Sequence, residues 1–95
     1  MEQLREIEVL VDVAVLGKQV DDFLRSDVGD YLIKHIDSEI LSGYNLLKSA
    51  KFSDAEAIRE AQNMVWRAEH MKEWLNNAIM AGLRATEVLE SREDD

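Results

Sequence analysis

Hydrophobic side chains recur along the chain at the three- and four-residue spacing of an α-helix. The segment 9–16 is rich in β-branched residues and resembles a strand, but a single strand without a partner makes no sheet. The spacing therefore predicts a first helix over about 2–24, in which Gly17 marks a kink or a frayed point. Its apolar positions are Leu4, Ile7, Leu10, Ala14, Val20, and Phe23 or Leu24.

A polar break at residues 25–27 separates this stretch from a second helix that runs to about residue 50. Ser26 or Asp27 can accept hydrogen bonds from the free amides at the start of that helix. Gly29 and Gly43 lie inside it, where glycine is unfavourable, and this favours close approach of another helix. One apolar stripe follows the helix, at Val28, Leu32, Ile36, Ile40, Tyr44 and Leu47.

A third helix is predicted from about residue 54 to residue 90. Ser53 and Glu56 have the spacing of a capping box, with Phe52 placed to pack against Ala57 as a hydrophobic staple. These 37 residues would span about 55 Å, whereas a compact domain of this size measures only about 25–35 Å. The helix must therefore bend, near 76–77 or Gly82, or project beyond its own core and require a partner.

The three helices predict an all-α fold, namely a three-helix antiparallel bundle with a long third helix that forms oligomers. We expect residues 1–90 to make a single helical domain and residues 91–95 to form an acidic, frayed tail.

The composition agrees with a helical chain and excludes several kinds of chemistry. The 95 residues include no Pro, and the absence of Cys excludes disulfide frameworks, thiolate metal sites and cysteine nucleophiles. The longest uninterrupted apolar stretch, residues 13–16, is far too short to cross a membrane, and nothing resembles a targeting signal. We therefore expect a soluble protein that stays where it is made and does not bind membranes.

The chain carries 20 acidic and 11 basic residues, a net charge of −9. The sequence contains no basic patch that could follow a phosphate backbone, so direct binding to nucleic acid is not expected. The negative charge has two interpretations. It can keep the protein soluble through self-repulsion, or it can imitate the phosphates of a nucleic acid.

The residues give little sign of catalysis or metal binding. Di-metal carboxylate bundles repeat a Glu-x-x-His motif, whereas this chain has the reverse order, His70-x-x-Glu73, only once, and pairs His35 with Glu39 one turn later. No serine lies in a Gly-x-Ser-x-Gly turn, and no glycine-rich phosphate loop is present. The sequence thus predicts a non-enzymatic protein without a cofactor.

Large aromatic and methionine side chains on the third helix are the best candidates for binding a partner. Trp66 and Trp74 are eight residues apart and so lie within about 80° of each other around the helix. Such side chains form either a core or an oligomer interface, and tryptophan is enriched at interface hot spots. We expect partner binding to rest on Trp66, His70, Met71, Trp74, Tyr31 and Tyr44.

The motif Phe23-Leu24-x-Ser26-x-x-Gly29-x-Tyr31-Leu32, with later residues from Ile58 to Gly82, resembles a group of short all-helical proteins of tailed bacteriophages and prophages. The resemblance covers roughly residues 17–89. Asp30 stands where a basic residue is common in that group. Genes for this group tend to lie near those for virion assembly and DNA packaging. The resemblance therefore implies a phage setting and an accessory, non-enzymatic role.

Together these observations predict a protein-interaction module that is accessory to virion assembly or is a minor virion component. It would bind a phage structural protein, a host factor or further copies of itself through helix–helix packing, in the cytoplasm of an infected bacterium or in the virion. The alternative is an anti-defence inhibitor that blocks a host immune complex by imitating nucleic acid, using clustered acids such as Glu69, Glu73, Asp21 and Asp22. A helical metalloenzyme is a third hypothesis, and it would depend on His35 and His70.

Overall fold

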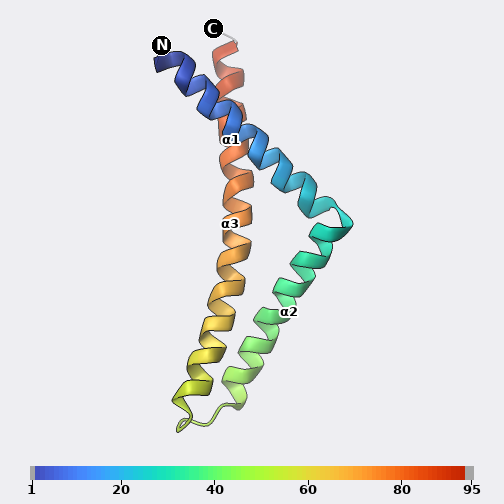
Figure 1. Ribbon diagram of the computed structural model, residues 1–95, viewed down its shortest axis with the longest axis vertical. Helices are drawn as coiled ribbons and strands as arrows, with labels where there is room; N and C mark the ends of the chain where they lie inside the picture. The colour runs from blue at the N-terminus through green and yellow to red at the C-terminus, as the bar shows by residue number, and fades with distance from the viewer. Residues whose placement is uncertain (1, 94–95) are drawn as a thin grey trace.

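The computed structural model describes residues 2–93, which form three α-helices and no strand (Figure 1). Helix α1 comprises Glu2–Arg25, α2 comprises Asp27–Ser49 and α3 comprises Ala55–Glu93. The predicted all-α class, the three helices and the long third helix are confirmed.

Helix α3 runs the whole length of the molecule, and the two shorter helices lie one after the other beside it (Figure 1). Both run antiparallel to α3, α1 crossing its C-terminal half and α2 following its N-terminal half. Both contact α3 more extensively than they contact each other. The result is elongated, 63 × 30 × 17 Å, with a radius of gyration of 19.1 Å. A compact chain of this length has a radius of about 12 Å.

The length of α3 is accommodated by this arrangement rather than by a break. Its 39 residues form one continuous helix through Asn76, Asn77 and Gly82, which corresponds to about 58 Å. Because α1 and α2 in series cover its two halves, no end of α3 projects alone (Figure 1).

The corner between α1 and α2 is built as the sequence predicts. Ser26 is the N-cap of α2, and its Oγ accepts a hydrogen bond from the Gly29 amide at 3.1 Å. The Ser26 amide in turn donates to the carbonyl of Phe23 at 3.0 Å. A Cβ atom on Gly29 would collide with that same carbonyl, so the turn requires glycine.

The start of α3 differs from the predicted capping box. The N-cap role falls to Asp54, whose Oδ1 accepts from the Ala57 amide at 3.0 Å, and the helix begins at Ala55, one residue later than a Ser53 cap requires. Aspartate caps as well as serine, and its charge also suits the helix dipole. With the cap shifted, Phe52 lies outside the staple position and is fully exposed, at 103%.

Two glycines set how closely α1 and α3 approach. A Cβ atom on Gly17 would lie 2.8 Å from the Cα of Gly82, and one on Gly82 would lie 2.8 Å from the Cα of Gly17. Gly17 is thus a buried contact inside a continuous helix, and the predicted kink or frayed point there is wrong. Gly43 plays a similar role in α2, where it faces Val65 and Ala61 of α3, as its position predicted.

These close contacts enclose very little apolar volume. Among the described residues, the buried hydrophobic side chains are small or medium-sized: Ile36, Ala61, Val65, Ala68 and Ala85. The solvent-accessible surface is 7687 Å², compared with about 5,600 Å² for a typical folded monomer of 10.9 kDa. A compact antiparallel bundle is therefore not confirmed, because the helices meet in pairs along α3 without a shared core.

The ends of α1 and α3 are joined by an ion pair. Arg92 Nη2 lies 3.1 Å from Glu6 Oε2, and α3 continues through Glu93. Residues 91–93 of the expected tail are thus helical, while 94–95 lie outside the described residues. No helix in the described part of the chain holds an apolar stretch long enough to cross a membrane.

Candidate interaction surface

Exposed apolar side chains follow helix α1 along both flanks of its contact with α3. Val9, Leu16 and Phe23 recur at seven-residue spacing and share one flank. The other flank carries exposed apolar residues at spacings of three and four, namely Leu4, Ile7, Val11 and Val15. A helix that is hydrophobic over most of its circumference is normally covered on more than one side.

The first flank belongs to a longer pattern that continues on α3. On α1, Val13 and Val20 alternate with Val9, Leu16 and Phe23 in the four–three spacing of a heptad repeat. Helix α3 repeats this spacing with exposed residues at 74, 81 and 88 and more buried alanines at 78 and 85. The exposed members of the two stripes are called the heptad face below: Val9, Leu16, Phe23, Trp74, Ala81 and Val88.

The two stripes lie on the same side of the α1–α3 pair. Val9 and Val88 line one open groove of about 690 Å³ between the helices. Val15 and Leu83 line a separate groove of about 670 Å³, which is flanked by Lys18. Since Val15 is one residue from Leu16 and so points about 100° away from it, the second groove belongs to the opposite side.

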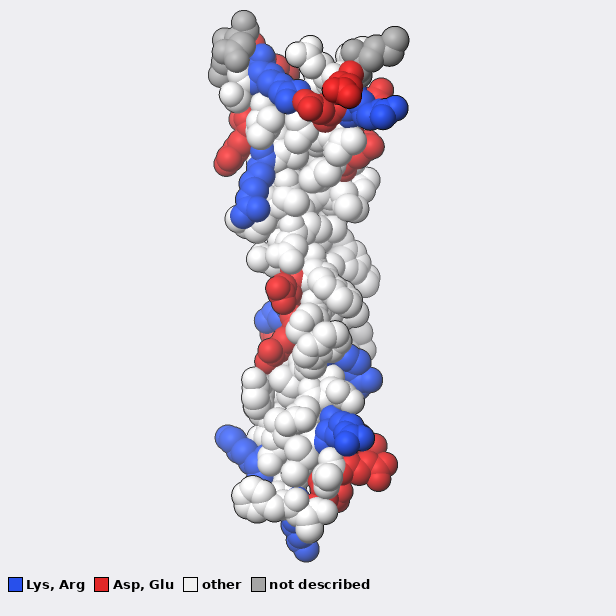
Figure 2. Space-filling model, turned by 90° about the vertical axis from the view of Figure 1, so that its left-hand side faces the viewer, with Lys and Arg blue, Asp and Glu red and all other residues white. Residues whose placement is uncertain are grey.

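Charge is absent from the centre of this crossing. Neither residues 13–17 of α1 nor residues 74–83 of α3 contain an acidic or basic side chain. Figure 2, which views the left-hand side of Figure 1, shows most charged side chains toward the two ends of the molecule and a smaller group of acidic and basic side chains near mid-height, with uncharged atoms around it. The two uncharged segments at the crossing can therefore contact another apolar surface without burying a charge of their own.

The predicted aromatic residues of α3 form a stacked row on its exposed side. The rings of Trp66 and His70 stack with centroids 4.0 Å apart, and Trp74 meets His70 edge-on at 6.4 Å. His70 Nδ1 lies 2.9 Å from the carbonyl oxygen of Trp66, which can only accept, so Nδ1 carries the proton. Both tryptophans remain exposed, at 56% and 63% for Trp66 and Trp74.

The other three predicted residues lie elsewhere. Tyr31 stacks on His35 at 6.4 Å, and Met71 lines a shallow hollow between α2 and α3 to which His35 also contributes. Tyr44 donates its hydroxyl to Glu69 Oε1 at 3.0 Å. Glu69 and Met71 are two residues apart on α3 and so point about 160° apart, which places Tyr44 and Met71 on opposite sides.

The six predicted binding residues therefore do not form one surface, and only Trp74 belongs to the heptad face. The remaining members of that face were missed as binding candidates. Their signal was present in the sequence, since residues 9, 13, 16, 20 and 23 keep a strict four–three spacing. It was obscured by a second stripe, at residues 4, 7, 10 and 14, on the same helix.

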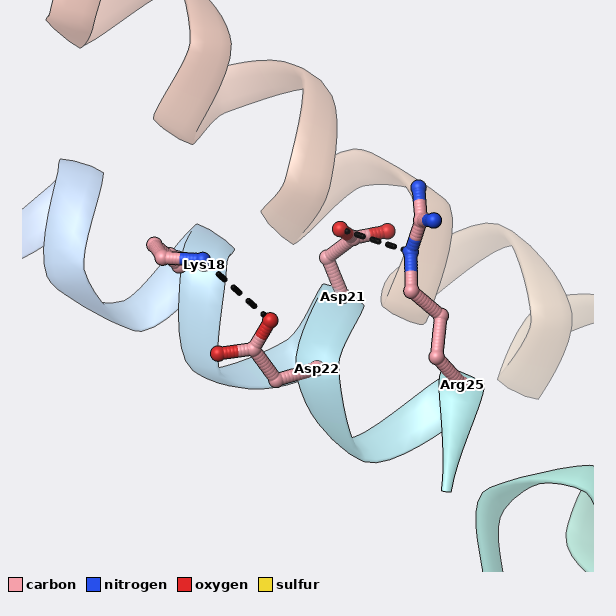
Figure 3. Close-up of polar contacts among 4 residues, drawn as sticks. All are labelled: Lys18, Asp21, Asp22 and Arg25. Carbon is pink, nitrogen blue, oxygen red and sulfur yellow. Dashed lines mark hydrogen bonds and ion pairs between the residues drawn. The ribbon is translucent and has the colours of Figure 1, made fainter. Parts of the chain in front are cut away.

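The acids invoked for imitation of nucleic acid are mostly paired. Asp22 Oδ1 lies 3.3 Å from Lys18 Nζ, and Asp21 Oδ2 lies 3.1 Å from Arg25 Nε (Figure 3). Glu69 accepts the Tyr44 hydroxyl. Three of the four named acids thus have a local partner, which works against a free row of phosphate-like charge.

Two of the polar contacts on α2 shift a pKa. The hydrogen bond to Glu69, and then the negative charge of that carboxylate, raise the pKa of Tyr44. The hydrogen bond and charge of Asp30, whose Oδ2 lies 2.8 Å from Lys34 Nζ, raise the pKa of Lys34. Both shifts stabilise the ordinary protonated form, so neither prepares a general base or a nucleophile.

Neither histidine belongs, within the residues that the structure describes, to a cluster of three or more side chains that could hold a metal ion. His35 Nε2 lies 3.9 Å from Glu39 Oε1, and His70 is held by the two tryptophans. Within residues 2–93, no group of three or more metal-ligating side chains is close enough to hold an ion.

Comparisons of the chain with protein-family models, with curated proteins and with solved structures gave no match.

Proposed function

We propose that this chain is a non-enzymatic protein-interaction module that binds through helix–helix packing. The supporting observation is that many of its large apolar side chains are exposed, while its fully buried hydrophobic residues are few and mostly small. A surface about 2,100 Å² larger than that of a typical monomer of this mass supports the proposal, because a stable interface takes only about 800 Å² from each partner.

We further propose a phage setting, in which the module is accessory to virion assembly or is a minor component of the particle. The residues that carry the resemblance to phage proteins include Phe23, Ser26 and Gly29, which build the corner between α1 and α2. This corner fixes the directions in which α1 and α2 leave it, and so determines which apolar flanks stay open. The resemblance thus concerns the feature on which the proposed binding depends.

The test is to recover assembling particles from bacteria in which the encoding phage or prophage is induced, and to quantify this chain in them by mass spectrometry. The proposal expects a fixed number of copies per particle or per assembly intermediate. A Leu16→Glu variant should be lost from the particles, while Val15→Glu, its neighbour outside the heptad face, should be retained.

Two results would contradict the proposal. The chain could be absent from particles and from every assembly intermediate, which would remove the assembly role. Both variants could instead assemble like the unaltered protein, which would show that the exposed apolar surface near the crossing binds nothing there.

A further inference from the structure

The heptad face has the residue pattern of one half of a helical core. Helices α1 and α3 run in opposite directions and cross obliquely in contact at Gly17 and Gly82, and each presents an apolar stripe on the same side (Figure 1). In four-helix arrangements such a pair is completed by a second pair that faces it. We propose that the occupant is a second copy of this chain, whose heptad face packs against the first around a twofold axis. This inference rests on the proposed function and names its partner.

The poor core of the isolated chain favours a second copy over any other partner. A protein that fully buries only a few small and medium-sized apolar side chains gains little from folding alone. The surface that packs against its exposed apolar side chains must therefore be present when the chain folds. A second copy is produced in equal amount at the same time and place, and obligate dimers commonly have no stable folded monomer.

Electrostatic repulsion limits which surfaces of two copies can pack together. Each carries a net charge of −9, so they repel each other wherever their acids would come together. The uncharged segments 13–17 and 74–83 cross at the centre of the heptad face, where contact brings no like charges together. Charged residues border the grooves on both sides of the α1–α3 pair. On the opposite side Lys18 lies directly beside the Gly17 contact, whereas the charged residues at the groove of the heptad face, Glu2, Arg5, Glu6 and Arg92, lie near the outer ends of α1 and α3.

The sizes of the side chains also fit self-association. Ala81 lies in the middle of the α3 stripe, with the half-buried Ala78 beside it, while Leu16 lies in the middle of the α1 stripe. A twofold axis through this centre places the leucine of each copy near the alanines of the other. Large residues opposite small ones allow close packing without strained rotamers.

The first experiment measures mass in solution over a wide range of concentration, by light scattering after size exclusion. The unaltered protein should have twice the mass of the 10.9 kDa chain. Leu16→Glu and Ala81→Glu should shift the mass to that of one chain at concentrations where the parent is dimeric. Val15→Glu and Leu83→Glu, which are matched exposed positions on the same helices, should remain dimeric.

A second experiment avoids variants that fail to fold. The chain has no cysteine, so Leu16→Cys and Val15→Cys each introduce a single thiol, and neither places a charge in the proposed contact. Leu16 and Val15 are 55% and 49% exposed within one chain, so a monomer would let both thiols react at similar rates. We expect the reaction of the Leu16→Cys thiol to slow at least about tenfold at high protein concentration, and that of Val15→Cys to stay unchanged.

Three outcomes would overturn the inference. A helical monomer at all concentrations would exclude the second copy, while the proposed function would still be decided by the particle experiment. Protection of Val15→Cys instead of Leu16→Cys would place the contact between copies on the opposite side. Equal protection of both thiols would indicate association without a defined face. In the last two cases the chain still associates, so the proposed function survives.

Discussion

Gly17 of α1 and Gly82 of α3 lie so close together that neither position has room for a side chain. A Cβ atom on Gly17 would come within 2.7 Å of the carbonyl oxygen of Ala78, as well as 2.8 Å from the Gly82 Cα. The clashing atoms belong to the backbone, which cannot relieve the clash by changing rotamer as a side chain can. The crossing of the two helices therefore depends on the absence of a methyl group at both positions.

Replacing Gly82 with alanine should destabilise the protein although alanine favours helices. The helical preference of alanine contributes about 1 kcal/mol, whereas forcing the two backbones apart costs about 2–3 kcal/mol, the upper part of the range for overpacked sites, because the clashing atoms belong to the backbone. We expect a net loss of about 1–2 kcal/mol in the free energy of unfolding, measured with urea at one protein concentration. An unchanged or increased stability would show that the helices are not in contact at this point.

Gly43 offers a comparison, because the nearest obstacle there is the side chain of Val65. Gly43→Ala should be destabilising in the parent, and about 1 kcal/mol less so in a Val65→Ala background, where the obstructing methyl group is gone. The measurement is a double-mutant cycle of unfolding free energies. Strictly additive effects would contradict the close contact between α2 and α3.

The start of α3 gives a test of which residue caps the helix. Asp54→Ala should lower the free energy of unfolding by about 1 kcal/mol, because it leaves the Ala57 amide without its acceptor. Ser53→Ala should change it by less than about 0.5 kcal/mol. The reverse order, with the larger effect at Ser53, would restore the capping box that the sequence predicts.

Local features of this fold were readable from the sequence because they depend on residues close together in the chain. The cap at Ser26 and the close approach at Gly43 were found in this way. The capping box at Ser53 was wrong because Asp54, an equally good cap, follows it directly, and the sequence alone does not rank two adjacent caps.

The arrangement of the helices was harder to predict because it depends on contacts between distant residues. The excess length of the third helix was recognised correctly, but placing α1 and α2 in series along it requires knowing that Gly17 meets Gly82, 65 positions later. For the same reason, the sequence could not place the six binding candidates relative to one another. Helical spacing relates residues within α3, such as Trp66 and Trp74, but cannot place Tyr31 and Tyr44 of α2 relative to them.

The hydrogen bond from Tyr44 to Glu69 predicts a stabilising contact that depends on pH. Since the pKa of Tyr44 is higher in the folded chain than in the unfolded one, the contribution is complete below the unfolded value of about 10 and is lost as pH rises through the higher folded value. In a Tyr31→Phe background, ultraviolet absorbance reports the ionisation of Tyr44 alone. Its midpoint should fall when Glu69→Gln removes the negative charge, and an unmoved midpoint would exclude the contact.

Trp74 should contribute to self-association where Trp66 does not. Both lie on α3, have similar exposure and flank the same His70 ring, but only Trp74 belongs to the heptad face. We expect Trp74→Ala to weaken the dimer by about 2 kcal/mol, which is about 30-fold in Kd, as at an interface hot spot. Trp66→Ala should change Kd less than about threefold, measured by sedimentation equilibrium. Equal losses for both variants would move the contact to the row formed by Trp66, His70 and Trp74, and a larger loss for Trp66 would place it outside the heptad face.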